Sequence, residues 1–111
     1  MGFSLGASLA LGRATQDARL RAVVDYFGAL PEPVAARATR MAPTLILHGE
    51  LDRIVPVEHA YALERFLNDR RVPYEIKIYP GQGHGFTGLV PADAGTRTIR
   101  FLDRYLNCAR P

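Results

Sequence analysis

Three residues have the types and the order in the chain that nucleophilic catalysis needs: Ser4, Asp52 and His84. Ser4 is the central residue of Gly2-Phe3-Ser4-Leu5-Gly6, which has the G-x-S-x-G pattern of a nucleophile elbow, a turn between a strand and a helix. A serine hydroxyl becomes a nucleophile when a neighbouring base takes its proton, and a histidine can accept that proton near neutral pH. An aspartate bound to the other ring nitrogen fixes the tautomer of the histidine. We therefore predict Ser4 as the nucleophile, His84 as the base and Asp52 as the acid.

The residues around Ser4 would also favour the negative charge that develops during acyl transfer. Gly2 and Gly6 permit a tight turn and close packing of a helix on a strand. The helix expected after Ser4 would direct its first backbone N–H groups at the developing oxyanion. We expect the N–H of Leu5 to be one of these donors.

The elements that must position these residues follow from the hydrophobic pattern. Strands are expected at Leu20–Phe27, Pro43–Gly49 and Pro73–Tyr79, and helices at Ser4 to about Ala14, at Pro56–Asn68 and from Pro91 onward. The last helix would carry Ile99, Leu102 and Leu106 on one face, with Phe101 and Tyr105 beside it. Helices alternating with strands are typical of a parallel sheet, so the fold class is α/β. Asp52 and His84 each follow a predicted strand, where the reactive crevice of such a sheet lies.

Other residues of the same types receive different interpretations. For His48, at the end of a predicted strand, we favour a packing role over a place in the lining of the crevice. His59 is expected in solvent on a helix, and Glu50 is a less favoured acid than Asp52. Asp25 is kept as a backup acid. Cys108, near the end of the sequence, is expected to be unreactive.

The composition excludes several classes of protein. The net charge is only +3, and the basic residues, all but one of them arginines, are scattered, which argues against a nucleic-acid partner. No stretch approaches 18 apolar residues, so no membrane-spanning segment is expected. A single cysteine permits no internal disulfide and fits a reducing, cytoplasmic location. No group of residues has metal-ligand spacing, so no metal is expected.

Four segments together resemble the carboxyl-terminal half of dienelactone hydrolase-family proteins, which are α/β-hydrolases: GFSLGASLAL, VVDYFGALPE, PTLILHGELDRIVP and YEIKIYPGQGHGF. The resemblance implies one domain over residues 1–111 with a partial α/β-hydrolase fold, and the same roles for Ser4, Asp52 and His84. It implies hydrolysis of a small-molecule ester or lactone through an acyl-enzyme, with no cofactor.

The sequence departs from the family at two positions that bear on the substrate. Family members usually carry cysteine where this chain has Ser4. They also tend to have an arginine soon after the histidine, where this chain has Phe86-Thr87-Gly88. We therefore expect a general ester substrate rather than dienelactone.

The family's sheet has strands before the elbow, and we expect these amino-terminal strands, including the one that leads into Ser4, to be missing here. The bare apolar edge of the Leu20–Phe27 strand would then favour self-association, and a second oxyanion donor would be lacking. We expect little or no activity from the 111-residue chain alone. Two alternatives stay open: a non-catalytic remnant or interaction module that pairs through this edge, and a fragment of a prolyl-oligopeptidase-like peptidase.

Overall fold

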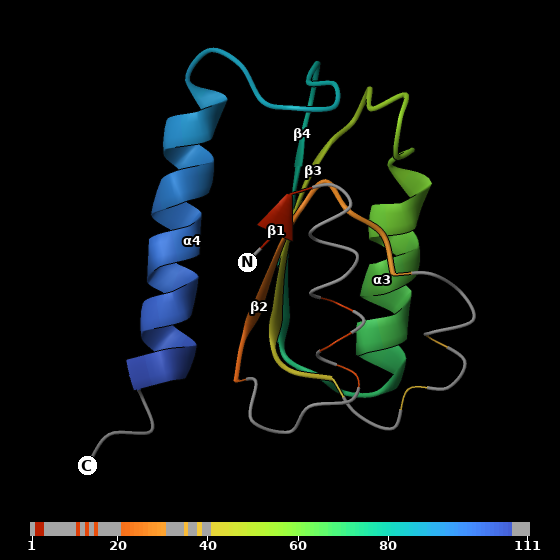
Figure 1. Cartoon of the computed structure of the whole chain (residues 1–111), viewed down its shortest axis with the longest axis vertical. Helices are drawn as coiled ribbons and strands as arrows, with labels where there is room; N and C mark the ends of the chain where they lie inside the picture. Colours follow the sequence, from red (N-terminus) through yellow and green to blue (C-terminus); the bar gives the residue numbers. More distant parts are fainter. Residues whose placement is uncertain are drawn as a thin grey trace.

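A four-stranded parallel sheet lies at the centre of the computed structural model, with a helix on each side of it (Figure 1). The structure describes residues 2–3, 11, 13, 15, 21–30, 35, 38 and 41–107, and for residues 2, 3, 106 and 107 it describes the backbone only. The strands are β1 (Gly2–Phe3), β2 (Val23–Tyr26), β3 (Thr44–Gly49) and β4 (Tyr74–Tyr79), in the spatial order β1-β2-β3-β4. The prediction of an α/β fold with a parallel sheet is confirmed.

The register of the sheet brings the carboxyl ends of β3 and β4 to the same level. Thr44 pairs with Tyr74 at one end of the two strands, and Gly49 pairs with Tyr79 at the other. Residues that follow β3 therefore lie beside residues that follow β4, at the top of the sheet in Figure 1. This edge carries the predicted acid and base.

The strand β1 corrects one expectation from the sequence. We expected no strand before the elbow, but Gly2 pairs with Asp25 and Phe3 pairs with Tyr26, so β1 covers part of the outer edge of β2. A parallel ladder needs only a short extended segment to form its first hydrogen bonds. Two residues are too few to produce a hydrophobic pattern, which is why the sequence did not indicate this strand.

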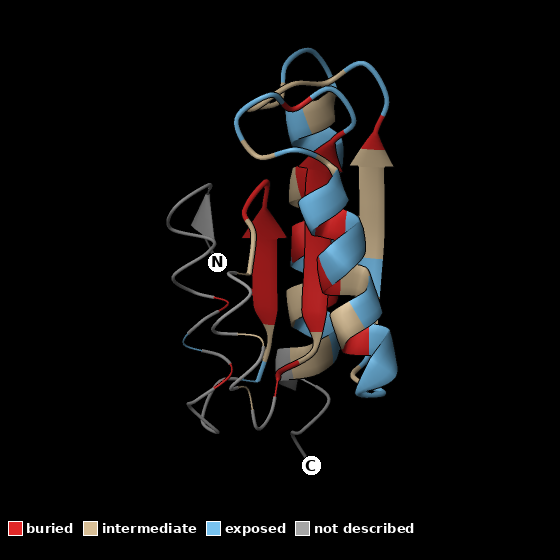
Figure 2. Ribbon diagram, turned by 90° about the vertical axis from the view of Figure 1, so that its right-hand side faces the viewer, coloured by how far each residue is buried: buried red, intermediate tan, exposed pale blue. Residues whose placement is uncertain are grey.

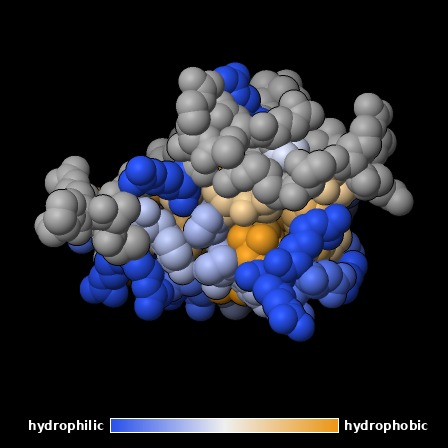
Figure 3. All heavy atoms as spheres, turned by 90° about the horizontal axis from the view of Figure 1, so that it is seen from below, coloured by the Kyte–Doolittle hydropathy of each residue, from blue (hydrophilic) through white to orange (hydrophobic). Residues whose placement is uncertain are grey.

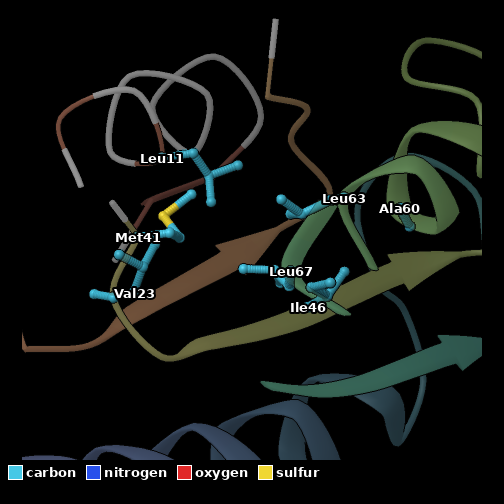
Figure 4. Close-up of a cluster of buried hydrophobic side chains, with 8 residues drawn as sticks. Leu11, Val23, Met41, Ile46, Ala60, Leu63 and Leu67 are labelled. Atoms are coloured by element: carbon cyan, nitrogen blue, oxygen red, sulfur yellow. The ribbon is translucent and has the colours of Figure 1, made fainter. Parts of the chain in front are cut away.

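The first of the two cores lies between the sheet and α3 (Glu58–Asp69). The helix buries residues at helical spacing, as predicted, and they pack against side chains of β2 and β3 and against Leu11 (Figure 4). The buried members of this cluster are Leu11, Val23, Met41, Ala42, Ile46, Ala60, Leu63 and Leu67. Figure 2 shows β2 and β3 buried along their whole length, whereas β4 is mostly half-buried.

The second core lies between the other face of the sheet and α4 (Val90–Asn107). The packed face of α4 contains Ala94, Thr98 and Phe101. Leu102 packs against this core, as predicted, but Ile99 is 71% exposed, so its predicted place on the same face was wrong. The reason is a buried polar contact: the Thr98 hydroxyl donates to the Ala94 carbonyl (2.8 Å) and lies 2.6 Å from the Tyr26 hydroxyl. These bonds let a polar residue occupy the centre of the packed face.

The opposite end of the sheet, seen from below in Figure 3, shows mainly hydrophilic residues around a small hydrophobic patch over the part of the surface that is described. Within the described residues, no helix is long and apolar enough to cross a membrane. The predicted acid and base, Asp52 and His84, lie at the other end, beyond the carboxyl ends of β3 and β4.

Candidate active site

The structure brings Asp52 and His84 into direct contact. Asp52 lies in the loop after β3, His84 lies in the loop after β4, and the Nδ1 atom of His84 is 2.8 Å from Oδ2 of Asp52. The two residues are 32 positions apart in the sequence but come from neighbouring strands. This contact is possible because the register of β3 and β4 brings their carboxyl ends side by side.

The carboxylate of Asp52 is buried and held on both of its oxygens. Its side chain is 0% exposed, and Oδ1 accepts hydrogen bonds from the backbone N–H groups of Ile54 (2.9 Å) and Val55 (2.8 Å). Burial by itself opposes ionisation, but the hydrogen bond from His84 and those from the two amides outweigh it and hold the pKa of Asp52 below its ordinary value. Oδ2 is thereby directed at His84.

An ionised carboxylate fixes the tautomer of the histidine. Because the ionised carboxylate of Asp52 can only accept a hydrogen bond, Nδ1 of His84 must carry the hydrogen of the 2.8 Å bond. In the neutral ring Nε2 is then the basic nitrogen, which is the tautomer that a general base needs toward a serine hydroxyl.

Close backbone packing holds the two loops against each other. The Leu51 N–H donates to the Gln82 carbonyl (2.9 Å), and a Cβ atom on Gly49 would come within 2.6 Å of the Gly83 carbonyl oxygen. Glycine is therefore required at the end of β3, because any side chain there would push away the loop that carries His84.

An aromatic ring that was not expected from the sequence contacts the imidazole, and further rings pack behind it. The Phe27 ring lies 4.9 Å from the His84 ring and 5.1 Å from the Phe86 ring, centroid to centroid, and Phe86 in turn lies 4.9 Å from Tyr79. Phe27 has a φ of 43°, which non-glycine residues rarely adopt and which ends β2. The Phe-Gly pair after the strand was the available signal for a turn at this position.

The other candidate residues lie apart from the Asp52–His84 pair or have structural contacts. Asp25 is fully buried, its Oδ1 accepts the N–H of Gly28 (2.8 Å), and burial raises its pKa to about 8. Glu50 and His59 are exposed. His48 is buried and bonds to the Val55 carbonyl, in keeping with the packing interpretation but with a specific partner.

Some predicted residues lie outside those that the structure describes. Ser4, Leu5 and Cys108 are among them, so the nucleophile, the oxyanion donor and the unreactive thiol stay predictions. Across the described part of the chain, no group of three or more His, Cys, Asp or Glu residues could hold a metal ion.

One pocket among the described residues does not include this pair. It has a volume of about 430 Å³, and its lining consists of Ala29, Leu30, Ala35, Glu58, His59, Ala62, Leu63, Arg65 and Phe66. We locate the candidate site by the chemistry of its side chains rather than by the depth of the surface.

Comparison with known proteins gives a family. The pattern of the Dienelactone hydrolase family matches residues 1–98. A carboxymethylenebutenolidase homolog of Xenopus tropicalis is 30% identical over 100 residues, which cover 79% of this chain and 40% of that protein. A Bacillus subtilis protein named uncharacterized peptidase YtmA is 34% identical over 65 residues, covering 59% of this chain and 24% of its own.

Among solved structures, the crystal structure of esterase PE8 superposes with a TM-score of 0.71 and 33% identity, covering 88% of this chain and 48% of that one. The chain thus spans less than half the length of each of these proteins. The fold, the family match and the relatives agree: the chain belongs to the dienelactone hydrolase family, whose members are hydrolases that act on lactone and ester bonds.

Proposed function

We propose that this chain supplies the nucleophile, base and acid of a serine hydrolase that cleaves a small-molecule ester or lactone through an acyl-enzyme on Ser4. The observation that carries the proposal is the 2.8 Å hydrogen bond between His84 Nδ1 and the buried carboxylate of Asp52. This bond leaves Nε2 as the basic nitrogen of His84. Membership of a family of ester and lactone hydrolases supports the reaction class.

The proposed reaction has two halves that use the same base. In the first, Nε2 of His84 takes the proton of the Ser4 hydroxyl while Oγ attacks the carbonyl carbon, and the same proton then passes to the leaving alkoxide as the acyl-enzyme forms. In the second, water loses a proton to His84 and attacks the acyl carbon, and Ser4 leaves with that proton. Asp52 stabilises the imidazolium in both halves, and the N–H of Leu5 is proposed as one oxyanion donor.

The aromatic cluster bears on how this base is held. Phe27 meets the imidazole through an edge-to-face ring contact, and Phe86 packs against Phe27. The Phe27 ring limits the orientation of His84 and keeps water from the part of the imidazole that it covers, which strengthens the hydrogen bond to Asp52.

Labelling with a fluorophosphonate probe tests the proposal, because such probes react with activated serines and do not require the natural substrate. The full chain as its gene encodes it should be labelled at Ser4, and the Ser4→Ala and Asp52→Asn variants should be labelled little or not at all. Glu50→Gln is the matched control, since Glu50 is an exposed acid two residues from Asp52. Folded wild-type protein that resists the probe would contradict the proposal.

A comparison of kcat/KM for the two substrate classes tests whether the enzyme prefers esters or peptides. The relative named a peptidase makes peptide bonds the competing substrate class. We propose ester substrates, so p-nitrophenyl esters should be hydrolysed with a higher kcat/KM than aminoacyl p-nitroanilides. The opposite preference would favour the peptidase alternative.

A second candidate function is pairing with another chain through the sheet edge. The β1 strand pairs only with Asp25 and Tyr26, so no described strand covers Val23 and Val24 on that side of β2. Such an edge can add a strand from a second copy. A discrete homodimer without probe labelling, seen by size-exclusion chromatography with light scattering, would favour this function over catalysis.

A further inference from the structure

His48 is a second buried histidine that faces the predicted acid. It lies in β3, four residues before Asp52, and is 0% exposed. Its Nε2 atom lies 2.7 Å from the Val55 carbonyl oxygen and 3.4 Å from Oδ2 of Asp52. The same ring nitrogen therefore faces both the backbone of the acid loop and the carboxylate oxygen that binds His84.

The contacts determine the protonation state of this ring. A backbone carbonyl can only accept a hydrogen bond, so Nε2 of His48 must carry the hydrogen that points at Val55. Burial, the largest influence, lowers the pKa of His48, so the ring is neutral near neutral pH. Nδ1 is then an unprotonated acceptor, and it has no hydrogen-bond partner among the described residues.

The backbone of Val55 is thereby held on both sides. Its N–H donates to Oδ1 of Asp52 (2.8 Å), and its carbonyl accepts the Nε2–H of His48 (2.7 Å). The orientation of the Asp52 carboxylate depends on the Val55 N–H, and the position of the Val55 backbone depends on His48. A side chain on a rigid central strand thus anchors the loop that aims the carboxylate.

We infer that His48 is a positioning residue for the acid: by donating from Nε2 to the Val55 carbonyl, it holds the Val55 N–H in the place from which that amide directs Asp52 toward His84. The consequence for turnover rests on the proposed function, whereas the hydrogen-bond arrangement does not involve Ser4. The competing explanation is packing alone, but a phenyl or branched aliphatic side chain would fill this space without burying an unpartnered nitrogen.

Two substitutions separate positioning from packing. His48→Gln keeps an amide N–H that can reach the Val55 carbonyl, whereas His48→Phe keeps a flat ring and loses the donor. We expect His48→Phe to slow fluorophosphonate labelling of Ser4 and to lower kcat for a p-nitrophenyl ester by about 10²-fold with little change in KM, as misplacement of a catalytic group by about 1 Å does. His48→Gln should keep a labelling rate and a kcat close to those of the wild type. His59→Gln, on an exposed histidine of α3, is the control.

The inference would be overturned if His48→Gln were more impaired than His48→Phe in probe labelling and in kcat. Packing alone predicts that the apolar His48→Phe is the better tolerated variant and that His48→Gln is the impaired one. Equal rates for His48→Phe and wild type would also refute positioning. If His48→Phe does not fold, the test uses the wild-type protein. Long-range ¹H–¹⁵N NMR should then show His48 as the neutral Nε2–H tautomer. A charged ring or the Nδ1–H tautomer would refute the inference.

A separate readout distinguishes failure of this inference from failure of the proposed function. Amide hydrogen exchange at Val55 should be faster in folded His48→Phe than in His48→Gln, whatever the reaction of Ser4. Wild-type protein that the probe does not label would count against the hydrolase proposal only. Equal exchange at Val55 in the two variants would count against the role of His48.

Discussion

Asp25→Asn is expected to make the protein more stable at alkaline pH and to leave its stability unchanged near pH 4. The Asp25 side chain is fully buried in β2, and Oδ2 has no hydrogen-bond partner among the described residues. Burial raises its pKa from the ordinary 3.8 to about 8, despite the hydrogen bond from Gly28 that favours the ionised form. Asparagine keeps the oxygen that accepts the Gly28 N–H and has no proton to lose.

The direction and size of the effect follow from proton linkage. Between pH 4 and pH 8 the folded protein holds a proton on Asp25 that the unfolded chain has released, so the free energy of unfolding falls as pH rises through this range and levels off above it. About four pH units separate the ordinary pKa of 3.8 from pH 8, and each unit is worth about 1.4 kcal/mol, which gives about 6 kcal/mol at most at pH 8. Water that reaches the ionised carboxylate reduces this cost, so we expect Asp25→Asn to gain about 2–4 kcal/mol at pH 8.

Urea unfolding of the full chain at pH 4, 6 and 8 measures this effect. The difference in the free energy of unfolding between Asp25→Asn and wild type should be near zero at pH 4 and should grow with pH. Asp69→Asn, at the exposed end of α3, is the matched control and should keep the wild-type pH dependence. A difference that is constant with pH, or a variant that is less stable than wild type at pH 8, would refute the reasoning about a buried, protonated Asp25.

Four further substitutions test the site and the packing around it. Asp52→Asn should lower kcat for ester hydrolysis by about 10⁴-fold, because the amide favours the wrong tautomer of the histidine; an unchanged kcat would contradict the assignment. Gly49→Ala should lower the free energy of unfolding in urea by about 1–3 kcal/mol and should slow probe labelling, because its methyl group collides with the loop that carries His84. Gly95→Ala, in α4 with open space around it, should instead gain about 0.5–1 kcal/mol. Tyr26→Phe should cost about 1 kcal/mol by removing the buried hydroxyl bond to Thr98.

The parts of the fold that could be predicted are those with a dense local pattern. The apolar run before Gly49 and the alternation before Pro80 indicated β3 and β4, and the spacing of buried residues indicated α3. The meeting of Asp52 and His84 also followed from the sequence, because the carboxyl ends of parallel strands share one edge of a sheet.

The parts that could not be predicted depend on contacts between distant residues. Thr98 belongs to a packed face only because Tyr26 provides a hydroxyl partner 72 residues away. His48 bonds to a backbone carbonyl in the loop that carries Asp52, and every residue has such a carbonyl, so the residue types do not indicate this contact. The ring of Phe27 reaches His84 because the backbone turns at a positive φ, a conformation that the sequence does not favour at phenylalanine.

The pairing of β3 with β4 makes the acid and the base parts of one β-α-β crossover, which runs from Thr44 through α3 to the loop after Tyr79. One continuous stretch of the chain therefore supplies both partners of the hydrogen bond between Asp52 and His84, and the register of two adjacent strands brings them together. Under the proposed function, an exchange of serine for cysteine at position 4 would change the group that attacks the substrate and would leave the contact between Asp52 and His84 in place.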